Sequence, residues 1–445
     1  YRFYLYFCSP KFNIEDMIQE LKIKNFLSFK EEVTFSFEAT KDTFAEDFQV
    51  VEVAEGVRLL RFAMVYGANA SGKSNLLKAF DFLHNFWFYK PADLDKKTGV
   101  IPFKLDSHTP NEPSCFELIF YVGCTKYWYQ LKLDEKQVFC EKLFYYKSVQ
   151  PTLLFEWELK DSQSVITFNP TAIKISSVAK EKIAVECLKN MSFFAARDKV
   201  NVSIPIIDVA KDWIKNQILP IVEPKTFMFQ YAERQMLKDQ DIKSYLLDFV
   251  HEADFNIVDV NTQAEKKDMP QEVIDKILND NELSEQEKEN LIKDRYITTP
   301  KTDFIHKVQN ERGEETYSLP KILQSEGTKR IFGLEAAIYK ALQKKGFLSI
   351  DEIETSLHPH LLKFLLLHFL RKESRSQLLI STHYDPLLNE IDGIFRKDSV
   401  WFTEKTKSGH TDVYSLIDFK GLNRLSSIQK AYNYRKFGAV PNIDL

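Results

Sequence analysis

The phosphate-binding pattern G-x-x-x-x-G-K-[ST] is matched at every defined position by Gly67-Ala68-Asn69-Ala70-Ser71-Gly72-Lys73-Ser74. An apolar run at 59–66 precedes it and a helical pattern at 75–80 follows, so we expect a strand, a loop and a helix. In such a loop the glycines permit close backbone approach, while loop amides and the helix N-terminus face phosphates. We therefore expect Lys73 to supply a cation to ATP and Ser74 to offer its hydroxyl to Mg²⁺. The residues expected to bind the nucleotide are Gly67, Asn69, Ala70, Ser71, Gly72, Lys73, Ser74 and Asn75.

Three further polar residues follow two apolar runs in the last third of the chain. Asp351 and Glu352 follow the run 347–350, and His383 follows the run 376–382. One carboxylate at a strand end can position Mg²⁺, and the next can orient or deprotonate an attacking water. We expect Asp351 in the metal site, Glu352 in catalysis and His383 at the γ-phosphate. The alternatives are an acidic surface turn and a structural histidine.

Alternating strands and helices must bring these residues together. A periodic apolar helix opens at 325–330 and ends near Gly346, and another runs from Pro359 to about Lys372. Together with the strands at 347–350 and 376–383, this order indicates a mostly parallel sheet. The site is expected along the edge formed by the carboxyl ends of its strands.

Antiparallel strands are predicted in the first third of the chain. Residues 18–39 alternate polar and apolar, which suits two half-buried strands leading towards the phosphate loop. The segments 116–122, 127–133 and 138–144 are rich in aromatic and β-branched residues, which indicates a meander. One or two more strands are expected within 153–168.

The overall composition is that of an ordinary globular protein. The 445 residues are 44% hydrophobic and 28% charged, and the net charge of -4 gives no global nucleic-acid signature. The longest apolar stretch, 361–370, is too short to span a bilayer, so we expect no membrane segment. The five cysteines lack metal-ligand spacing, and reduced thiols in a cytoplasmic protein are the preferred interpretation. They are Cys8, Cys115, Cys124, Cys140 and Cys187.

Changes of pattern divide the chain into segments. The two halves of a nucleotide-binding core are expected at 17–171 and 316–418, with a helical lobe inserted at 172–315. Within that lobe, 261–294 carries ten acids and five lysines, which predicts a solvated, mobile helical stretch. Residues 1–16 precede Met17, a more natural beginning, and are interpreted as a possible N-terminal extension or an extra strand.

The last segment, 419–445, is predicted to be a basic aromatic tail. Between Phe419 and Lys436 it carries five Lys or Arg and no acid, together with Tyr432 and Tyr434. Such a mixture can grip phosphates and stack bases, so DNA contact is one hypothesis. Docking on the protein's own core or on a partner is the other.

The order of these motifs resembles that of the ABC-type AAA ATPases, the class of SMC, RecF and OLD-like proteins. The resemblance implies an α/β head with a mixed sheet, in which an antiparallel meander accompanies a parallel phosphate-loop core. It also implies that Ser325 and Gly327 belong to a signature loop, which binds the γ-phosphate held by the opposite subunit. Here that loop reads Leu323-Gln324-Ser325-Glu326-Gly327-Thr328, which departs from the usual Leu-Ser-Gly-Gly-Gln. The glutamine that usually senses Mg²⁺ is not placed, and Gln130 stays unassigned.

Five stretches are similar to one bacterial subfamily, the RloA and AbiL-type ATPases of phage-defence operons, and to the ATPase subunit of the PARIS system. They are 18–29, 66–75, 325–330, 351–359 and 432–441. The resemblance implies a homodimer or higher oligomer formed through ATP-bound heads. It also implies an effector encoded nearby, commonly a Toprim-like nuclease, and a phage protein or DNA as the trigger. The acids after His383 lack a metal-binding arrangement, so no nuclease site is expected in this chain.

Three functions remain open at this stage. The first is an ATP-driven switch that controls an effector during phage infection. The second is a RecF- or SMC-like ATPase that binds DNA in repair or end recognition, for which we expect salt-sensitive DNA binding. The third, a nucleotide-dependent scaffold without turnover, fits less well because both acids after the strand are present.

Overall fold

The computed structural model describes residues 16–253, 255–278, 288, 292–293 and 296–441. The chain forms two compact units. The first unit contains the chain up to Pro224, Lys340–Thr355 and Leu365 onwards, and the second contains Lys225–Tyr339 and Ser356–Phe364. The proposed extension at 1–16 lies outside the described residues except for Asp16.

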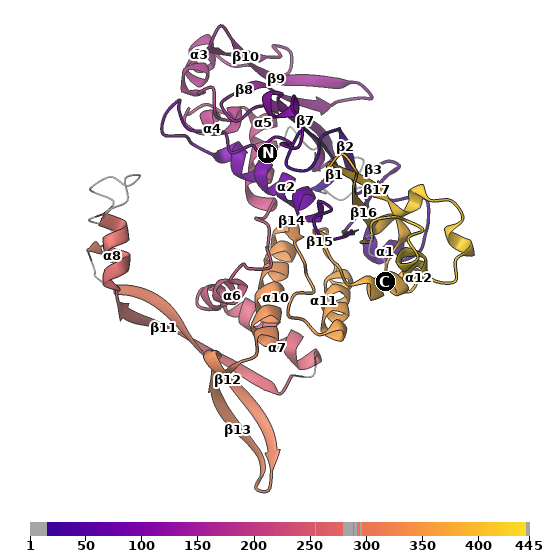
Figure 1. Cartoon of the computed structure of the whole chain (residues 1–445). Helices are drawn as coiled ribbons and strands as arrows, with labels where there is room; N and C mark the ends of the chain where they lie inside the picture. Colours follow the sequence, from indigo (N-terminus) through magenta and orange to yellow (C-terminus); the bar gives the residue numbers. More distant parts are fainter. Residues whose placement is uncertain (1–15, 254, 279–287, 289–291, 294–295, 442–445) are drawn as a thin grey trace. The chain divides into compact units, whose positions relative to one another are not determined.

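A five-stranded sheet in the order β14-β15-β5-β16-β17 forms the centre of the first unit (Figure 1). Four of its strands are parallel, and β17 pairs antiparallel with β16. Every residue of β5, β14 and β15 is buried, as expected for parallel strands covered on both faces. The strands are β5 (Phe62–Tyr66), β14 (Phe347–Ile350), β15 (Gln377–Ser381), β16 (Val400–Lys405) and β17 (Thr411–Ser415).

Helix α2 (Lys73–Phe88) follows β5 through the phosphate loop. Gly72 precedes the helix with φ +112°, a left-handed conformation that glycine adopts without strain. One face of the helix, which includes Leu76, Phe80 and Trp87, is buried in the core. The helix therefore holds the loop firmly against the sheet. Two other helices precede strands of this sheet along the chain, α10 (Glu326–Lys344) before β14 and α11 (Pro359–Arg371) before β15.

A seven-stranded antiparallel sheet in the order β10-β9-β8-β7-β6-β1-β2 also belongs to the first unit. Buried residues alternate along these strands, so that one face packs into the core. Its strands are β1 (Met17–Lys24), β2 (Val33–Ser36), β6 (Ser114–Val122), β7 (Thr125–Leu133), β8 (Val138–Tyr146), β9 (Pro151–Lys160) and β10 (Gln163–Phe168). The first unit also contains α1 (Glu46–Gln49), β3 (Val50–Ala54), β4 (Val57–Leu60), α3 (Ser177–Glu186), α4 (Phe193–Arg197) and α5 (Pro205–Gln217).

The mixed α/β fold confirms the predicted fold class, including the meander and the parallel core. The predicted strand at 59–66 differs, because it is divided at Arg61 into β4 and β5. The Arg61 guanidinium is buried and donates to the carbonyl oxygen of Phe48 over 2.8 Å and to that of Leu370 over 3.2 Å. These bonds fix a bend at which β4 turns away to pair with β3.

The second unit combines helices with a three-stranded sheet, β11-β12-β13. Figure 1 shows β11 and β12 as a long two-stranded ribbon that carries α8, while β12 and β13 form a second hairpin. A purely helical lobe was expected here, so the structure differs from that prediction. Polar residues lie on both faces along much of the ribbon, so the apolar–polar alternation by which strands are recognised is weak. Its elements are α6 (Met228–Met236), α7 (Gln240–Glu252), β11 (Ile257–Asp268), α8 (Gln271–Leu278), β12 (Tyr296–Asn310) and β13 (Gly313–Pro320).

The basic tail packs on the core of the first unit. Tyr432, on α12 (Ile428–Asn433), is buried and stacks on Phe402 with ring centroids 5.7 Å apart. Phe437 stacks on the same ring at 5.7 Å. By contrast, the Tyr434 side chain is 85% exposed. Tyr432 therefore docks on the protein's own core, as the second hypothesis for the tail expects, whereas Tyr434 faces solvent.

The four described cysteines are in two chemical states, and Cys8 lies outside the described residues. Cys115, Cys140 and Cys187 are free thiols, as expected. Cys124, in the turn between β6 and β7, is disulfide-bonded, so the expectation of a reduced thiol is wrong at this position.

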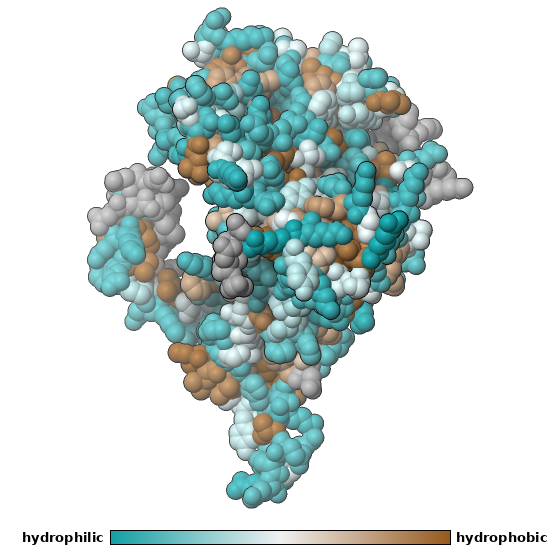
Figure 2. All heavy atoms as spheres, turned by 45° about the vertical axis from the view of Figure 1, so that its right-hand side comes forward, coloured by the Kyte–Doolittle hydropathy of each residue, from teal (hydrophilic) through white to brown (hydrophobic). Residues whose placement is uncertain are grey.

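Hydrophobic side chains on the face shown in Figure 2 form separate small groups among hydrophilic ones. Among the described residues, each helix is too short or too polar to cross a bilayer.

Candidate nucleotide-binding site

Lys73 closes over the phosphate loop. Its Nζ donates to the carbonyl oxygens of Gly67 and Ala68, over 2.9 and 3.2 Å. Burial lowers the pKa of Lys73 to about 8, against the opposing effect of nearby acids, of which Asp351 is the strongest. A buried ammonium that donates to carbonyls of its own loop can exchange these acceptors for phosphate oxygens.

The glycines of the loop leave no room for a side chain. A Cβ on Gly67 would lie 2.4 Å from both Ser71 Oγ and Thr403 Oγ1, and a Cβ on Gly72 would lie 2.4 Å from Thr411 Oγ1. The loop is therefore in close contact with β16 and β17. This close contact explains why both positions require glycine.

Ser74 and Asp351 lie side by side, as the sequence predicts. Ser74 Oγ donates to Asp351 Oδ1 over 3.1 Å, and the hydroxyl of Ser381, at the end of β15, donates to the same oxygen. Asp351 is 5% exposed. A hydroxyl oxygen beside a carboxylate oxygen is a donor set that fits Mg²⁺.

Glu352 and His383 also meet at this edge. Glu352 adopts φ +44°, a strained conformation for a residue with a side chain, and its amide donates to Ser381 Oγ over 2.9 Å. Its carboxylate Oε1 lies 3.9 Å from His383 Nε2. Burial, followed by the charge of Lys73, lowers the pKa of His383, which favours the neutral imidazole. His383 Nδ1 lies 3.5 Å from Lys73 Nζ.

Glu354 belongs to the same site, which the sequence did not predict. Its Oε1 accepts a 2.6 Å hydrogen bond from the backbone amide of His383. The bond ties the loop after β14 to the end of β15. Its position three residues after Asp351, on the same strand-end loop, was the available signal.

The structure separates the predicted residues into two groups. Lys73, Ser74, Asp351, Glu352 and His383 all belong to the first unit and converge at the carboxyl edge of its parallel sheet. Ser325 and Gly327 belong to the second unit.

In the second unit the predicted signature loop begins helix α10. Ser325 Oγ accepts from the Thr328 amide over 3.0 Å, which is the geometry of an N-cap. A Cβ on Gly327 would lie 2.9 Å from the carbonyl oxygen of Ser356, so this position also requires glycine. The unassigned Gln130 lies on β7, where its Nε2 donates to Glu117 over 3.2 Å.

A cavity of about 300 Å³ adjoins the loop in the first unit. It shares Asn75 with the start of α2, and apolar side chains form much of its wall. Its volume and mixed lining suit a nucleoside. The lining includes Leu27, Ser28, Asn75, Ile101, Leu105 and Lys405. This cavity cannot be recognised from the sequence, because its walls come from four separate segments.

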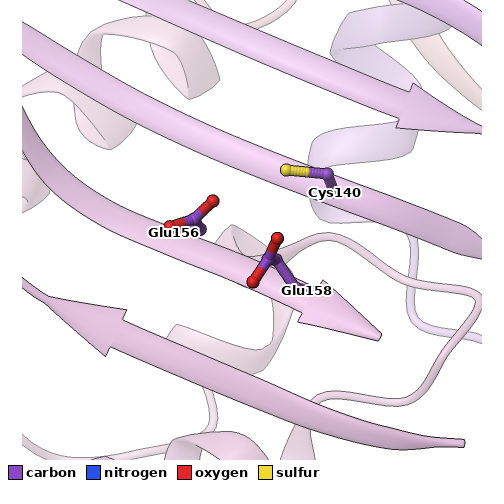
Figure 3. A group of neighbouring side chains, drawn as sticks. All are labelled: Cys140, Glu156 and Glu158. Atoms are coloured by element: carbon purple, nitrogen blue, oxygen red, sulfur yellow. The ribbon is translucent and has the colours of Figure 1, made fainter. Parts of the chain in front are cut away.

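A group of three potential metal ligands lies elsewhere in the first unit, on β8 and β9 (Figure 3). Ligand atoms of Cys140, Glu156 and Glu158 lie within 4.8 Å of one another. Lys142 pairs with Glu156 at 2.6 Å, and Lys160 pairs with Glu158 at 2.7 Å. Burial raises the pKa of Cys140 to about 11. One ion pair across β8 and β9 and one along β9 therefore account for this group, and we assign no metal to it.

A phosphate loop after β5, acids after β14 and a histidine after β15 define the class of P-loop ATPases. The chain belongs to the family described as "AAA domain, putative AbiEii toxin, Type IV TA system", whose model matches residues 62–176 and 197–389. Family membership makes the chain an ATPase-type nucleotide-binding protein. No curated protein gives a significant match.

Solved structures of SMC heads are similar to the chain at low identity. The SMC head domain from Thermotoga maritima is 12% identical with a TM-score of 0.38, over 89% of this chain and 98% of that one. An SMC head bound to the C-winged helix domain of ScpA is 12% identical with a TM-score of 0.44. The match covers 93% of this chain and 99% of that one. A Pyrococcus furiosus head with an extended coiled coil, bound to the C-terminal domain of ScpA, is 13% identical with a TM-score of 0.37, over 95% and 99%.

Proposed function

We propose that the chain binds ATP with Mg²⁺ at the phosphate loop and hydrolyses it to ADP and phosphate. The observation that carries this proposal is the convergence of Ser74, Asp351 and Glu352 beside Lys73. These groups come from two distant parts of the sequence, and family membership independently supports an ATPase.

Each residue has a distinct task in this proposal. Bound ATP and Mg²⁺ would supply the transferred phosphoryl group and a Lewis acid. Ser74 and Asp351 would hold the metal, and Lys73 would neutralise phosphate charge. Glu352 would orient and deprotonate the attacking water.

His383 would contact the γ-phosphate as a neutral donor. If Nδ1 accepts from Lys73, the ring proton lies on Nε2, the nitrogen that faces Glu352.

The site is proposed to be completed by a second copy. Ser325 and Gly327 would bind the γ-phosphate held by the opposite subunit, so turnover would require a homodimer or a higher oligomer. The N-terminus of α10 suits this role because its backbone amides favour an anion.

The biological role that we propose is a switch in bacterial anti-phage defence. The family description names a toxin and a type IV toxin–antitoxin system, which supports an abortive-infection type of function. ATP-driven closure would hold or release an effector encoded nearby, a Toprim-like nuclease, when a phage component is sensed. Such a switch requires that the trigger bind one of the two states more tightly.

A second candidate is a RecF- or SMC-like ATPase that binds DNA. It is favoured by the exposed Tyr434 ring, which is followed directly by Arg435 and Lys436. An exposed aromatic ring beside two cations suits nucleic-acid contact.

The test measures the ATPase rate and molar mass of the wild type and Glu352→Gln, with and without double-stranded DNA. Glu352→Gln should bind ATP, lose about 10²–10⁴-fold in turnover and accumulate as an ATP-bound dimer. Asp351→Asn is the matched control, because it removes a charge at the neighbouring position and should weaken Mg²⁺-dependent binding instead. Normal turnover of Glu352→Gln would remove this residue from catalysis. A rate that DNA raises and salt suppresses would favour the second candidate.

A further inference from the structure

The β16–β17 hairpin touches both the phosphate loop and the neighbouring cavity. Thr403 Oγ1, on β16, lies 2.6 Å from Ser71 Oγ, and Thr411 Oγ1, on β17, donates to the Ser71 carbonyl oxygen over 2.7 Å. Both threonines are almost fully buried. Lys405, the last residue of β16, and Gly409, in the turn between the two strands, line the cavity. One hairpin therefore supports the loop and borders the cavity.

A chain of hydrogen bonds joins the cavity to the loop. Asn75 Nδ2 donates to Ser28 Oγ over 2.8 Å, and Ser28 Oγ lies 2.8 Å from Thr411 Oγ1. Asn75 and Ser28 both line the cavity. The Thr411 amide also donates to the Ser28 carbonyl oxygen over 2.8 Å, so two hydrogen bonds join these residues.

The direction of this chain follows from the number of protons. A hydroxyl has one proton, and the Ser71 carbonyl can only accept, so the Thr411 proton goes to Ser71. The proton between Ser28 and Thr411 must then come from Ser28, whose oxygen accepts from Asn75. Each hydroxyl donates once and accepts once, an arrangement in which the bonds reinforce one another.

We propose that Thr411 is a positioning residue that couples nucleoside binding in the cavity to the geometry of the phosphate loop. A nucleoside that contacts Asn75 or Ser28 would fix the positions of these two side chains, where the series of hydrogen bonds begins. Thr411 would then hold the Ser71 carbonyl in a fixed position at the other end of the series. The packed contacts of Gly67 against Thr403 and of Gly72 against Thr411 leave the loop little freedom to move separately from the hairpin. The loop would thereby distinguish nucleoside triphosphates from inorganic triphosphate.

This inference rests on the proposed ATP binding, so the test separates binding from turnover. Thr411→Val keeps the shape of the side chain but removes the hydroxyl, which leaves the Ser71 carbonyl oxygen without this donor. Thr411→Ser keeps the hydroxyl. Thr406→Val is the control on the same hairpin, because the Thr406 hydroxyl bonds to Ser408 and His410 and lies outside the chain. Affinities for ATP and for inorganic tripolyphosphate are measured by competition with a fluorescent nucleotide, and kcat and KM are measured separately.

In the wild type, in Thr411→Ser and in Thr406→Val, ATP should bind more tightly than tripolyphosphate. In Thr411→Val this preference should fall by about tenfold, mainly through weaker ATP binding. An unchanged preference in Thr411→Val, or an equal loss of both ligands, would overturn the coupling. A wild type that binds ATP without hydrolysing it would overturn the proposed ATPase, while the binding ratios would still test Thr411.

Discussion

Burial and ligand binding shift the pKa of Lys73 in opposite directions. Burial lowers its pKa to about 8 in the ligand-free site, whereas bound phosphate would favour the charged ammonium. The pKa must therefore rise on nucleotide binding. At a pH of about 8.5 we expect ATP binding to take up most of a proton, and at a pH of about 7, where Lys73 is already charged, very little. Isothermal titration calorimetry in buffers of different ionisation enthalpy measures this uptake.

Lys73→Arg is the control for this proton uptake, because a guanidinium stays protonated throughout this pH range. Its proton uptake at the higher pH should be lost even where ATP still binds. The burial-lowered pKa keeps His383 neutral at both pH values, so it does not obscure the result. Equal uptake by the wild type at the two pH values would contradict a depressed pKa.

At this scale the sequence predicts residues whose partners are close in the chain or belong to a known motif. Lys73 and Ser74 are recognisable because the loop is contiguous. Thr403 and Thr411 lie more than 300 positions beyond Ser71, and their residue type carries no signal. Only the parallel pairing of β16 with β5 brings them to the loop.

Glu141 shows how a single carboxyl can join two elements. It lies on β8, is fully buried and accepts from the Phe193 amide and the Ser192 hydroxyl at the start of α4, both over 2.7 Å. Burial raises its pKa to about 7. The folded state therefore binds a proton that the unfolded state, with a pKa near 4.5, releases. This contribution to stability is complete below pH 4.5 and is lost as pH rises through 7.

Glu141→Gln should remove this pH dependence. The wild type should lose up to about 3 kcal/mol from this group between pH values of about 5 and 8, a change that the variant lacks. Urea unfolding at a series of pH values measures the difference. Glu158→Gln, on the neighbouring strand and partly exposed, serves as the control and should keep the wild-type profile. Parallel profiles for the wild type and Glu141→Gln would contradict the raised pKa.

Elements were predictable where burial imposes a clear pattern. The runs at β14 and β15 are wholly buried, so their apolar sequences read directly as core strands. The ribbon of β11 and β12 is exposed on both faces along much of its length, and its polar sequence resembles a solvated helix. Strand pairing over a long separation, here Asp268 with Tyr296, leaves no local trace.

At the scale of the whole molecule, the proposed catalytic residues are divided between two units. The first unit holds Lys73, Asp351 and Glu352, and the second holds Ser325 and Gly327. If Ser325 acts on the nucleotide of another copy, a dimer of one chain with a defective phosphate loop and one with a defective signature loop still has one intact site. A symmetric dimer has two such composite sites.

Two inactive variants should therefore restore activity when mixed. Lys73→Ala removes the phosphate-loop cation, and Ser325→Asp keeps the N-cap of α10 but places a negative charge where the γ-phosphate would bind. Each variant alone should be inactive, and Ser325→Asp should still bind ATP in its own loop. An equal mixture should recover up to about a quarter of wild-type turnover, because half of the dimers are mixed and each mixed dimer has one intact site. Ser325→Thr, which keeps both the cap and the hydroxyl, is the control and should stay active. Failure of the mixture to recover turnover, although the mixed dimer forms, would place Ser325 on the nucleotide of its own chain or outside the site.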